Sequence, residues 1–462
     1  MNHKPDIAEV ESFLAAHPDV AIADVLLPDM NGVLRGKQLA RGHIKDLFED
    51  GARMPASTYF LDWTGRNVEV LKYGANDGDP DNFALAVPGS IVPVPWASRP
   101  TAQTLVSLYD DNGDLHFGDP RGVLQRAAKP LHDMGLKIVI AIEYEFYLVE
   151  RNPDTGEVKP ARTPTFGDRP LTDNVYGLDD LSDRAALFDE IHEACEIQGL
   201  PAETFVSEYA PGQFEINLHH CDDVVTACDQ AILLERCIRE ISRKHGMIAT
   251  FMAKPFAETS GSGLHVHVSL IDKDGNNIFA GPMDPELNRP VSDALRHAAG
   301  GMIATMPDAM ALFAPNANSF RRLRPGSYAP IFGNWGSDNR SVSVRIPGSN
   351  EKNVRLEHRV AGADANPYLV VAGVLAGIHH GMVNKIAPPA PIPLSVDGYV
   401  EGGSSLPLNW NAALDAFKQS KVMPGYLGEE YAQVFQTARR WECDNFQAVI
   451  SALDYDWYLR TA

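Results

Sequence analysis

Residues 138–150 read IVIAIEYEFYLVE, an alternating stretch in which the even-numbered positions to 148 are apolar or aromatic, while Glu143 and Glu145 have odd numbers. Successive side chains of a β-strand point to opposite faces of its sheet. The stretch therefore predicts a strand that turns one face to a core and two carboxylates to the other side. Four further segments repeat this alternation: FEINLHH (214–220), GSGLHVHVSL (261–270), VSVRIP (342–347) and VRLEHRV (354–360).

The polar faces of these strands carry an unusual set of residues. A half-solvated sheet normally carries Thr, Lys, Ser and Glu in mixed order, whereas these faces carry Glu, His and Arg without Lys. Glu208 lies upstream of Glu215, across the turn at 210–212. The residues expected to share faces are Glu215, Asn217 and His219; His265, His267 and Ser269; Ser343 and Arg345; and Arg355, Glu357 and Arg359.

Convergence of these faces would bring carboxylates, imidazoles and guanidiniums into one site. Carboxylates at close range repel one another and need cations between them. Oxygen ligands with a single imidazole favour magnesium or manganese over zinc. Guanidiniums beside such metals suit a polyphosphate. The residue types thus indicate metal-assisted phosphoryl transfer and leave the acceptor open.

The segments around these strands predict an α+β protein. A hairpin is expected at 21–39, after a short helical lead over 1–19, and residues 40–105 are short, turn-rich segments. Amphipathic helices are expected from Ser182, as N-cap, to Gly199 and over about 222–246. A third helix is expected to start at 366–367, where proline follows an asparagine cap. We expect a small N-terminal sheet domain and a large antiparallel sheet backed by helices.

Composition narrows the class of function. The 462-residue chain is 44% hydrophobic and 22% charged, with a net charge of -21, which argues against nucleic-acid binding. Its five cysteines form no C-x-x-C pair and fit a reducing cytoplasm, where we expect the protein to be located. The first residues do not read as a signal peptide, and the longest apolar stretch, 368–378, is too short to cross a bilayer.

Six ordered motifs resemble the glutamine synthetase family, and the resemblance spans roughly residues 20–458. It implies a β-grasp-like N-terminal domain (1–108) and a catalytic domain shaped as an antiparallel β-funnel backed by helices (109–462). It further implies a homo-oligomer, a double-ring dodecamer whose active sites are shared between neighbouring subunits. The motifs are IEYEF, EYAPGQFE, FMAKPF with GSGLHVH, NSFRRLRPG, DNRSVSVRIP, and RLEHR with ANPYL.

The resemblance also implies roles for individual residues. One metal site would use Glu145, Glu208 and Glu215, and the other Glu143, His265 and Glu357, binding Mg²⁺ or Mn²⁺. ATP would be bound by His267, Ser269, Arg340, Arg345 and Arg355. Glutamate would be bound by Gly261, Arg322 and Arg359. Arg340, Arg359 and Tyr328 would be catalytic, with Arg359 facing the transferring phosphoryl group.

The implied reaction has two steps. The glutamate γ-carboxylate attacks the γ-phosphate of ATP and gives γ-glutamyl phosphate; a neutral amine then attacks this acyl phosphate and expels phosphate. Metals and arginines neutralise the charge that builds up on the phosphoryl oxygens.

Two departures from true glutamine synthetases concern the amine. Those enzymes carry an Asp-Gly-Ser-Ser motif whose Asp helps to bind ammonium, and the matching stretch 53–58 reads RMPAST. They also carry a flap Glu that takes a proton from ammonium, and Tyr328 occupies its position. Binding of ammonium requires several negative charges around it. The loss of both carboxylates therefore weakens the binding of ammonium and leaves room for an alkyl group. Ser260 also replaces the usual Asn before Gly261.

This pattern resembles the γ-glutamylpolyamine synthetase branch, which implies putrescine or spermidine as substrate. We expect Ser57, Tyr328, Trp335 and Asp338 to line the amine end, with Asp338 pairing a distal ammonium. The alternative is a purely structural role, in which Asp338 caps a turn and Trp335 packs in the core. Alternative functions are ligation of a small monoamine such as methylamine or ethanolamine, ordinary glutamine synthesis, a non-catalytic sensor, and a structural role; the presence of all six metal ligands disfavours the last.

Overall fold

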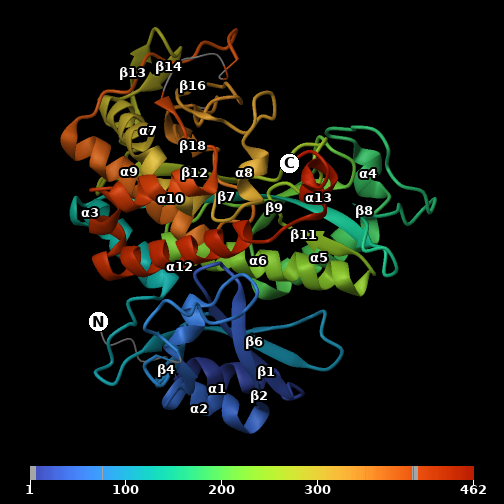
Figure 1. Ribbon diagram of the computed structural model, residues 1–462. Coiled ribbons are helices and arrows are strands. Elements are labelled where there is room, and N and C mark those ends of the chain that lie inside the picture. Colours follow the sequence, from blue (N-terminus) through green and yellow to red (C-terminus); the bar gives the residue numbers. More distant parts are fainter. Residues whose placement is uncertain (1–6, 75, 349, 398, 400–403) are drawn as a thin grey trace.

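The structure is a computed structural model that describes residues 7–74, 76–348, 350–397, 399 and 404–462. Helices and strands are mixed, and two sheets dominate, as expected for an α+β fold. In Figure 1 the N-terminal sheet, coloured blue, lies below helices α6 and α12, and the larger sheet lies on the other side of these helices. No helix among the described residues is long and apolar enough to span a membrane.

The N-terminal sheet has six strands, in the order β2-β1-β6-β4-β3 with β5 paired to β6. The hairpin expected at 21–39 is confirmed, because β1 and β2 pair antiparallel from Ile22↔Ala40 to Pro28↔Leu34. β6 runs parallel to β1 on the other side. The elements of this part are α1 (Ile7–Ala16), β1 (Ile22–Pro28), β2 (Leu34–Ala40), η1 (Arg41–His43), α2 (Ile44–Glu49), β3 (Ala52–Pro55), η2 (Ala56–Phe60), β4 (Asp81–Ala86), β5 (Val92–Pro93) and β6 (Thr101–Tyr109).

The larger sheet has nine strands, in the order β16-β17-β18-β12-β7-β10-β9, with β8 and β11 also paired to β7. All described pairings are antiparallel except that of β16 with β17. The strands are β7 (Lys137–Arg151), β8 (Val158–Pro160), β9 (Ala202–Ser207), β10 (Gln213–Leu218), β11 (Ile248–Thr250), β12 (Leu264–Ile271), β16 (Trp335–Ser337), β17 (Val344–Ile346) and β18 (Leu356–His358). Two small pairs add β13 (Ala280–Asp284) with β14 (Arg289–Val291) and β15 (Phe332–Gly333) with β19 (Ser404–Ser405).

Helix ends follow their capping residues. α6 (Val224–Lys244) begins after Asp223, whose side chain accepts from the Thr226 N–H, and α9 (Pro367–Asn384) begins after Asn366, whose side chain accepts from the Tyr368 N–H. The other helices are α3 (Pro120–Asp133), α4 (Leu178–Ser182), α5 (Ala185–Gln198), α7 (Asp293–Phe313), α8 (Ser319–Arg322), η3 (Glu351–Asn353), α10 (Trp410–Gln419), α11 (Met423–Leu427), α12 (Glu429–Gln447) and α13 (Ala452–Tyr458).

One predicted helix start was wrong. Ser182 is the last residue of α4 rather than an N-cap, and its hydroxyl donates to the Leu178 carbonyl. The following helix, α5, starts only at Ala185, after Arg184. Its end at Gly199 is as expected, because this glycine adopts the left-handed conformation that closes a helix.

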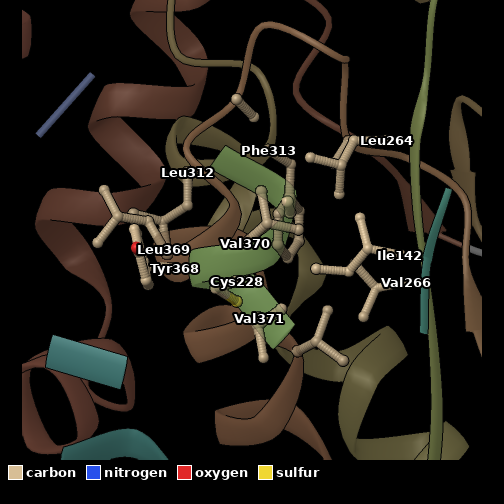
Figure 2. Close-up of a cluster of buried hydrophobic side chains, with 14 of the residues drawn as sticks. Ile142, Cys228, Leu264, Val266, Leu312, Phe313, Tyr368, Leu369, Val370 and Val371 are labelled. Carbon is tan, nitrogen blue, oxygen red and sulfur yellow. The ribbon is translucent and has the colours of Figure 1, made fainter. Parts of the chain in front are cut away.

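The apolar face of the larger sheet packs against a helical layer. Figure 2 shows Ile142 of β7 and Leu264 and Val266 of β12 facing Val370 of α9, with Phe313 of α7 beside them. Each such side chain contributes about 1.5–3 kcal/mol when it is fully buried. A shift of one residue in either strand would expose this face and bury the carboxylates instead. Burial of the core therefore sets the direction of the polar side chains.

Buried polar groups fasten the helices and the N-terminal part together. Asp229 of α6 accepts from Arg121 of α3 at 2.8 Å and 3.0 Å and from the Tyr368 hydroxyl of α9 at 2.6 Å. Arg439 of α12 donates to the Asn31 side chain at 2.6 Å. Such groups are retained in a core because each has a partner of opposite charge or matching hydrogen-bonding capacity.

Candidate active site

Adjacent strands bring their acidic side chains into register. Glu143 of β7 lies opposite Asn217 of β10 and also opposite His265 of β12. Glu145 lies opposite Glu215. Directly opposed residues of antiparallel strands have Cβ atoms about 4.5–5.5 Å apart. The pairing alone thus gathers four of the predicted metal ligands on one face.

The predicted set Glu143, His265 and Glu357 comes together. One possible ligand atom from each lies within 4.8 Å of the others. The Glu143 carboxylate also lies 3.2 Å from His265 Nδ1 and 2.9 Å from His267 Nε2. His265 is suited to ligation, since burial, followed by the charge of Arg359, lowers its pKa to about 4 and keeps the imidazole neutral.

The other predicted set is only partly assembled. Glu145 and Glu215 form a compact group with His265, again within 4.8 Å. Glu208 is absent from that group; its carboxylate accepts from the Tyr209 N–H at 3.3 Å. Its charge still acts on the group, since after burial it contributes most to raising the pKa of Glu145. Glu208 therefore lies at the edge of this cluster.

Unbalanced negative charge indicates that this cluster suits a divalent cation. Burial, and then the charge of Glu208, raises the pKa of Glu145 to about 8. Burial, and then the charge of Glu143, raises the pKa of Glu215 to about 9. Carboxylates that resist ionisation when crowded become ionised ligands once a cation lies between them. Carboxylate oxygens with one imidazole match Mg²⁺ or Mn²⁺.

These shifts predict how the stability of the metal-free protein depends on pH. Between the ordinary pKa of 4.5 and the raised values near 8 and 9, Glu145 and Glu215 bind more protons in the folded than in the unfolded state. Their contribution to the free energy of unfolding is complete below about pH 4.5 and is lost as the pH rises through about 8 to 9.

A bound cation replaces those protons, so Mg²⁺ or Mn²⁺ is expected to raise the melting temperature more at pH 9 than at pH 6. Thermal unfolding with metal and with a chelator, at both pH values, measures this difference. Equal increases at the two pH values would contradict the assignment of the cluster to a cation.

Guanidiniums border the predicted metal set of Glu143, His265 and Glu357. Arg345 donates to Glu357 at 2.7 Å, and Arg359 pairs with the other oxygen of the same carboxylate. Burial opposes ionisation of Glu357, but Arg359, foremost among its charged neighbours, lowers its pKa to about 2. Arg355 Nε donates to His267 Nδ1 at 3.1 Å. This side of the site thus holds fixed positive charge of the kind that binds phosphates.

The remaining residues assigned to ATP, Ser269 and Arg340, are less closely grouped. The Ser269 hydroxyl donates to the Val354 carbonyl at 3.0 Å, which leaves it bonded to the backbone. Arg340 is exposed and donates to the Tyr176 hydroxyl at 3.2 Å. Its own carbonyl accepts from Arg359 Nε at 3.2 Å, so the two arginines are linked.

The residues assigned to glutamate lie together next to the metal ligands. The Arg322 side chain is buried and donates to the Val360 carbonyl at 2.8 Å. A Cβ added at Gly261 would lie 2.7 Å from Arg322 Cγ, so the glycine backbone packs directly on this arginine. The Arg359 carbonyl accepts from Arg322 at 3.4 Å. The structure thus brings all three of these residues together.

The residues assigned to the amine are not gathered, and two of the assignments need correction. Trp335 is 0% exposed and its indole donates to the Pro389 carbonyl at 2.7 Å, so it belongs to the core. Asp338 pairs with Arg289 and with Arg345 and accepts from the Gly348 N–H, which leaves little capacity for an ammonium group. Ser57 is buried in η2 of the N-terminal part. Tyr328 alone is open, at 64% exposed.

Sequence reasoning did not single out two neighbours of the predicted metal ligands. Tyr147 and Gln213 form the next cross-strand pair beyond Glu145 and Glu215, and they contact the segment 259–263. Their odd numbers place them on the same faces as the metal ligands, so the strand period was the available signal. Arg289 of β14 pairs with the Asp338 carboxylate, and no sequence pattern near either residue predicted this pairing.

A cavity of about 1300 Å³ lies away from these side chains, between residues 62–69, α6 and the end of α12. None of the predicted site residues lines it. The perturbed carboxylates and the guanidiniums converge in the strand cluster instead, and such groups gather at functional sites.

Comparison with known proteins agrees with this geometry. The family model for the glutamine synthetase catalytic domain matches residues 117–458. The gamma-glutamylputrescine synthetase of Escherichia coli (strain K12) is 39% identical to this chain, over 98% of the chain and 95% of the relative. A glutamate–isopropylamine ligase of a Pseudomonas species is 31% identical, over 99% and 98%. A solved structure of GmaS in complex with ADP superposes with a TM-score of 0.83 at 25% identity, over 98% of this chain and 99% of that one.

Proposed function

This chain belongs to the glutamine synthetase family, and we propose that it is an ATP-dependent ligase that joins the γ-carboxylate of glutamate to an amine, putrescine or a related polyamine. The observation that carries the proposal is the convergence of two carboxylate–imidazole clusters with Arg345, Arg355 and Arg359 on one face of the sheet. Identity of 39% over nearly the whole length of a gamma-glutamylputrescine synthetase supports the choice of amine.

In the first step, an oxygen of the glutamate γ-carboxylate bonds to the γ-phosphorus of ATP as the bond to ADP breaks. Arg322, with Gly261, would hold the glutamate, Arg345 would bind the ATP phosphates, and Arg359 would face the transferring phosphoryl group. Divalent cations bound by Glu143, Glu145, Glu215, His265 and Glu357, with Glu208 at the edge, would supply further positive charge beside the phosphoryl oxygens. Rigid positive groups stabilise the transition state because they need no reorientation as charge develops.

In the second step, the neutral amine nitrogen bonds to the γ-carbon, phosphate leaves with one former carboxylate oxygen, and the nitrogen releases one proton to solvent. One observation supports an alkylamine over ammonium: no acidic residue occurs between Leu323 and Pro330, the run that contains Tyr328. The open Tyr328 ring offers an apolar surface, where the methylene groups of a diamine could pack.

A panel of amines tests the proposal. Purified protein with glutamate, ATP and magnesium is assayed for ADP release with ammonium, methylamine, ethanolamine, putrescine, cadaverine and spermidine. We expect putrescine or another polyamine to support turnover at far lower concentration than ammonium does. Preference for a monoamine would instead favour an activity like that of the glutamate–isopropylamine ligase. Equal use of ammonium would contradict the argument from the missing carboxylates.

Tyr328→Glu provides a matched variant for the panel. It places a carboxylate in the exposed flap and is expected to raise the preference for ammonium over putrescine by about tenfold, equivalent to about 1.4 kcal/mol of differential binding. An unchanged ratio of the two kcat/KM values would show that Tyr328 does not face the amine.

Assembly and domain division form part of the same proposal. We place the domain boundary after residue 108, near the end of β6. Ser57 lies in the N-terminal part and outside the strand cluster of its own chain. This supports a ring in which the N-terminal domain of one subunit completes the site of the next, in a double-ring dodecamer. Light scattering on the purified protein tests the number of subunits.

A further inference from the structure

Gln213 lies where the segment 259–263 meets the metal ligands. It is the first residue of β10, two positions before Glu215, and pairs across the sheet with Tyr147. Its side chain is 1% exposed. A buried amide needs partners for both its oxygen and its nitrogen, so its contacts show what it holds in place.

Both ends of the amide are used. The nitrogen donates to the Gly261 carbonyl at 3.0 Å and to the Glu145 carboxylate at 3.3 Å. The oxygen accepts from the Ser260 hydroxyl at 2.5 Å and from the Ala210 N–H at 3.4 Å. One side chain therefore bonds both to a metal-site carboxylate and to the segment that carries Gly261.

Tyr147 holds the same segment from the neighbouring strand. Its hydroxyl donates to the Ser260 carbonyl at 2.6 Å and lies 3.0 Å from the Thr259 hydroxyl. The segment then reaches Glu145 a second time, because the Gly263 N–H donates to that carboxylate at 2.8 Å. Unlike Tyr147, Gln213 bonds to Glu145 as well as to the segment.

We propose that Gln213 is a positioning residue that couples the glutamate-binding segment 259–263 to the metal site at Glu145, whereas Tyr147 anchors only the segment. Ser260 is part of this device, since its hydroxyl is directed to Gln213. The inference rests on the proposed function for the identity of the bound glutamate. The chemistry is general: an amide that fixes a ligating carboxylate and a substrate loop together makes the geometry of each depend on the other.

Three variants test the coupling. Gln213→Met keeps the buried volume and removes all four hydrogen bonds. Tyr147→Phe keeps the ring and removes the bonds to the segment. Gln198→Met is the matched control, because Gln198 is a buried glutamine whose nitrogen donates to the Pro93 carbonyl at 2.9 Å, outside the site. Binding of Mn²⁺ is followed by electron paramagnetic resonance with and without glutamate, and glutamate KM is measured by ADP release.

Gln213→Met is expected to weaken both Mn²⁺ binding and the apparent affinity for glutamate by about 10- to 100-fold. Tyr147→Phe is expected to raise the glutamate KM while Mn²⁺ binding without glutamate stays unchanged. Gln198→Met is expected to change neither. Wild-type values for Mn²⁺ and glutamate in Gln213→Met would overturn the coupling. Failure of the wild-type protein to use glutamate with any amine would instead overturn the proposed function, and the two outcomes are distinct.

Discussion

Replacing Glu357 with glutamine is expected to lower the rate of ADP release by at least about 100-fold. Glu357 is 1% exposed, contributes to the cluster with Glu143 and His265, and receives hydrogen bonds from Arg345 and Arg359. Glutamine has nearly the same shape as glutamate but lacks the negative charge that attracts both the cation and the two guanidiniums. Leaving two guanidiniums without their carboxylate is also expected to lower the free energy of unfolding, by about 3–5 kcal/mol.

Glu351→Gln is the matched control, since Glu351 is exposed in η3, six residues earlier in the same segment. Steady-state assays are run at a temperature where thermal unfolding shows both variants to be folded, and Mn²⁺ binding is measured alongside. The role assigned to Glu357 is wrong if Glu357→Gln retains the turnover and the Mn²⁺ affinity of Glu351→Gln.

Gly263→Ala is expected to reduce kcat/KM for glutamate by about 100-fold. A Cβ at this position would lie 2.6 Å from Arg322 Nη2 and 2.9 Å from His265 Nε2, too close for either group to keep its place. One methyl group would thus displace the proposed glutamate arginine and a proposed metal ligand together. Misplacement of reacting groups by about 1 Å is sufficient for a loss of this size.

Gly425→Ala provides the comparison, because a Cβ there would meet nothing within 4 Å and the residue lies in α11, outside the site. Its kinetics should match those of the wild type. Wild-type kcat/KM in Gly263→Ala would show that the packing of Arg322 and His265 around this glycine is not needed for glutamate use.

The strand period predicted much of the site, because side-chain direction in a strand depends only on position once one face is buried. Glu143, Glu145 and Glu215 were placed on the correct faces by this rule, and the register of β7 with β10 and β12 then aligned them. Because the positions of Tyr147 and Gln213 follow from the same rule, they could have been found from the sequence as well.

Other features depend on partners far apart in the chain. Trp335 was expected either to line the amine end or to pack in the core; it is buried in the core, where a large apolar ring gains more free energy, and the Pro389 carbonyl accepts from its N–H. Asp338 was expected to pair with a distal ammonium or to cap a turn, but Arg289 of β14 pairs with it. The start of α5 was missed because α4 intervenes as a separate turn of helix.

The most direct test follows oxygen atoms through the reaction. The protein is incubated with ATP, magnesium, putrescine and glutamate that carries ¹⁸O in both γ-carboxylate positions, and the products are examined by mass spectrometry. We predict a γ-glutamyl amide of putrescine that retains one ¹⁸O and inorganic phosphate that carries the other. Unlabelled phosphate, or ADP release without an amide product, would contradict ligation through γ-glutamyl phosphate at this site.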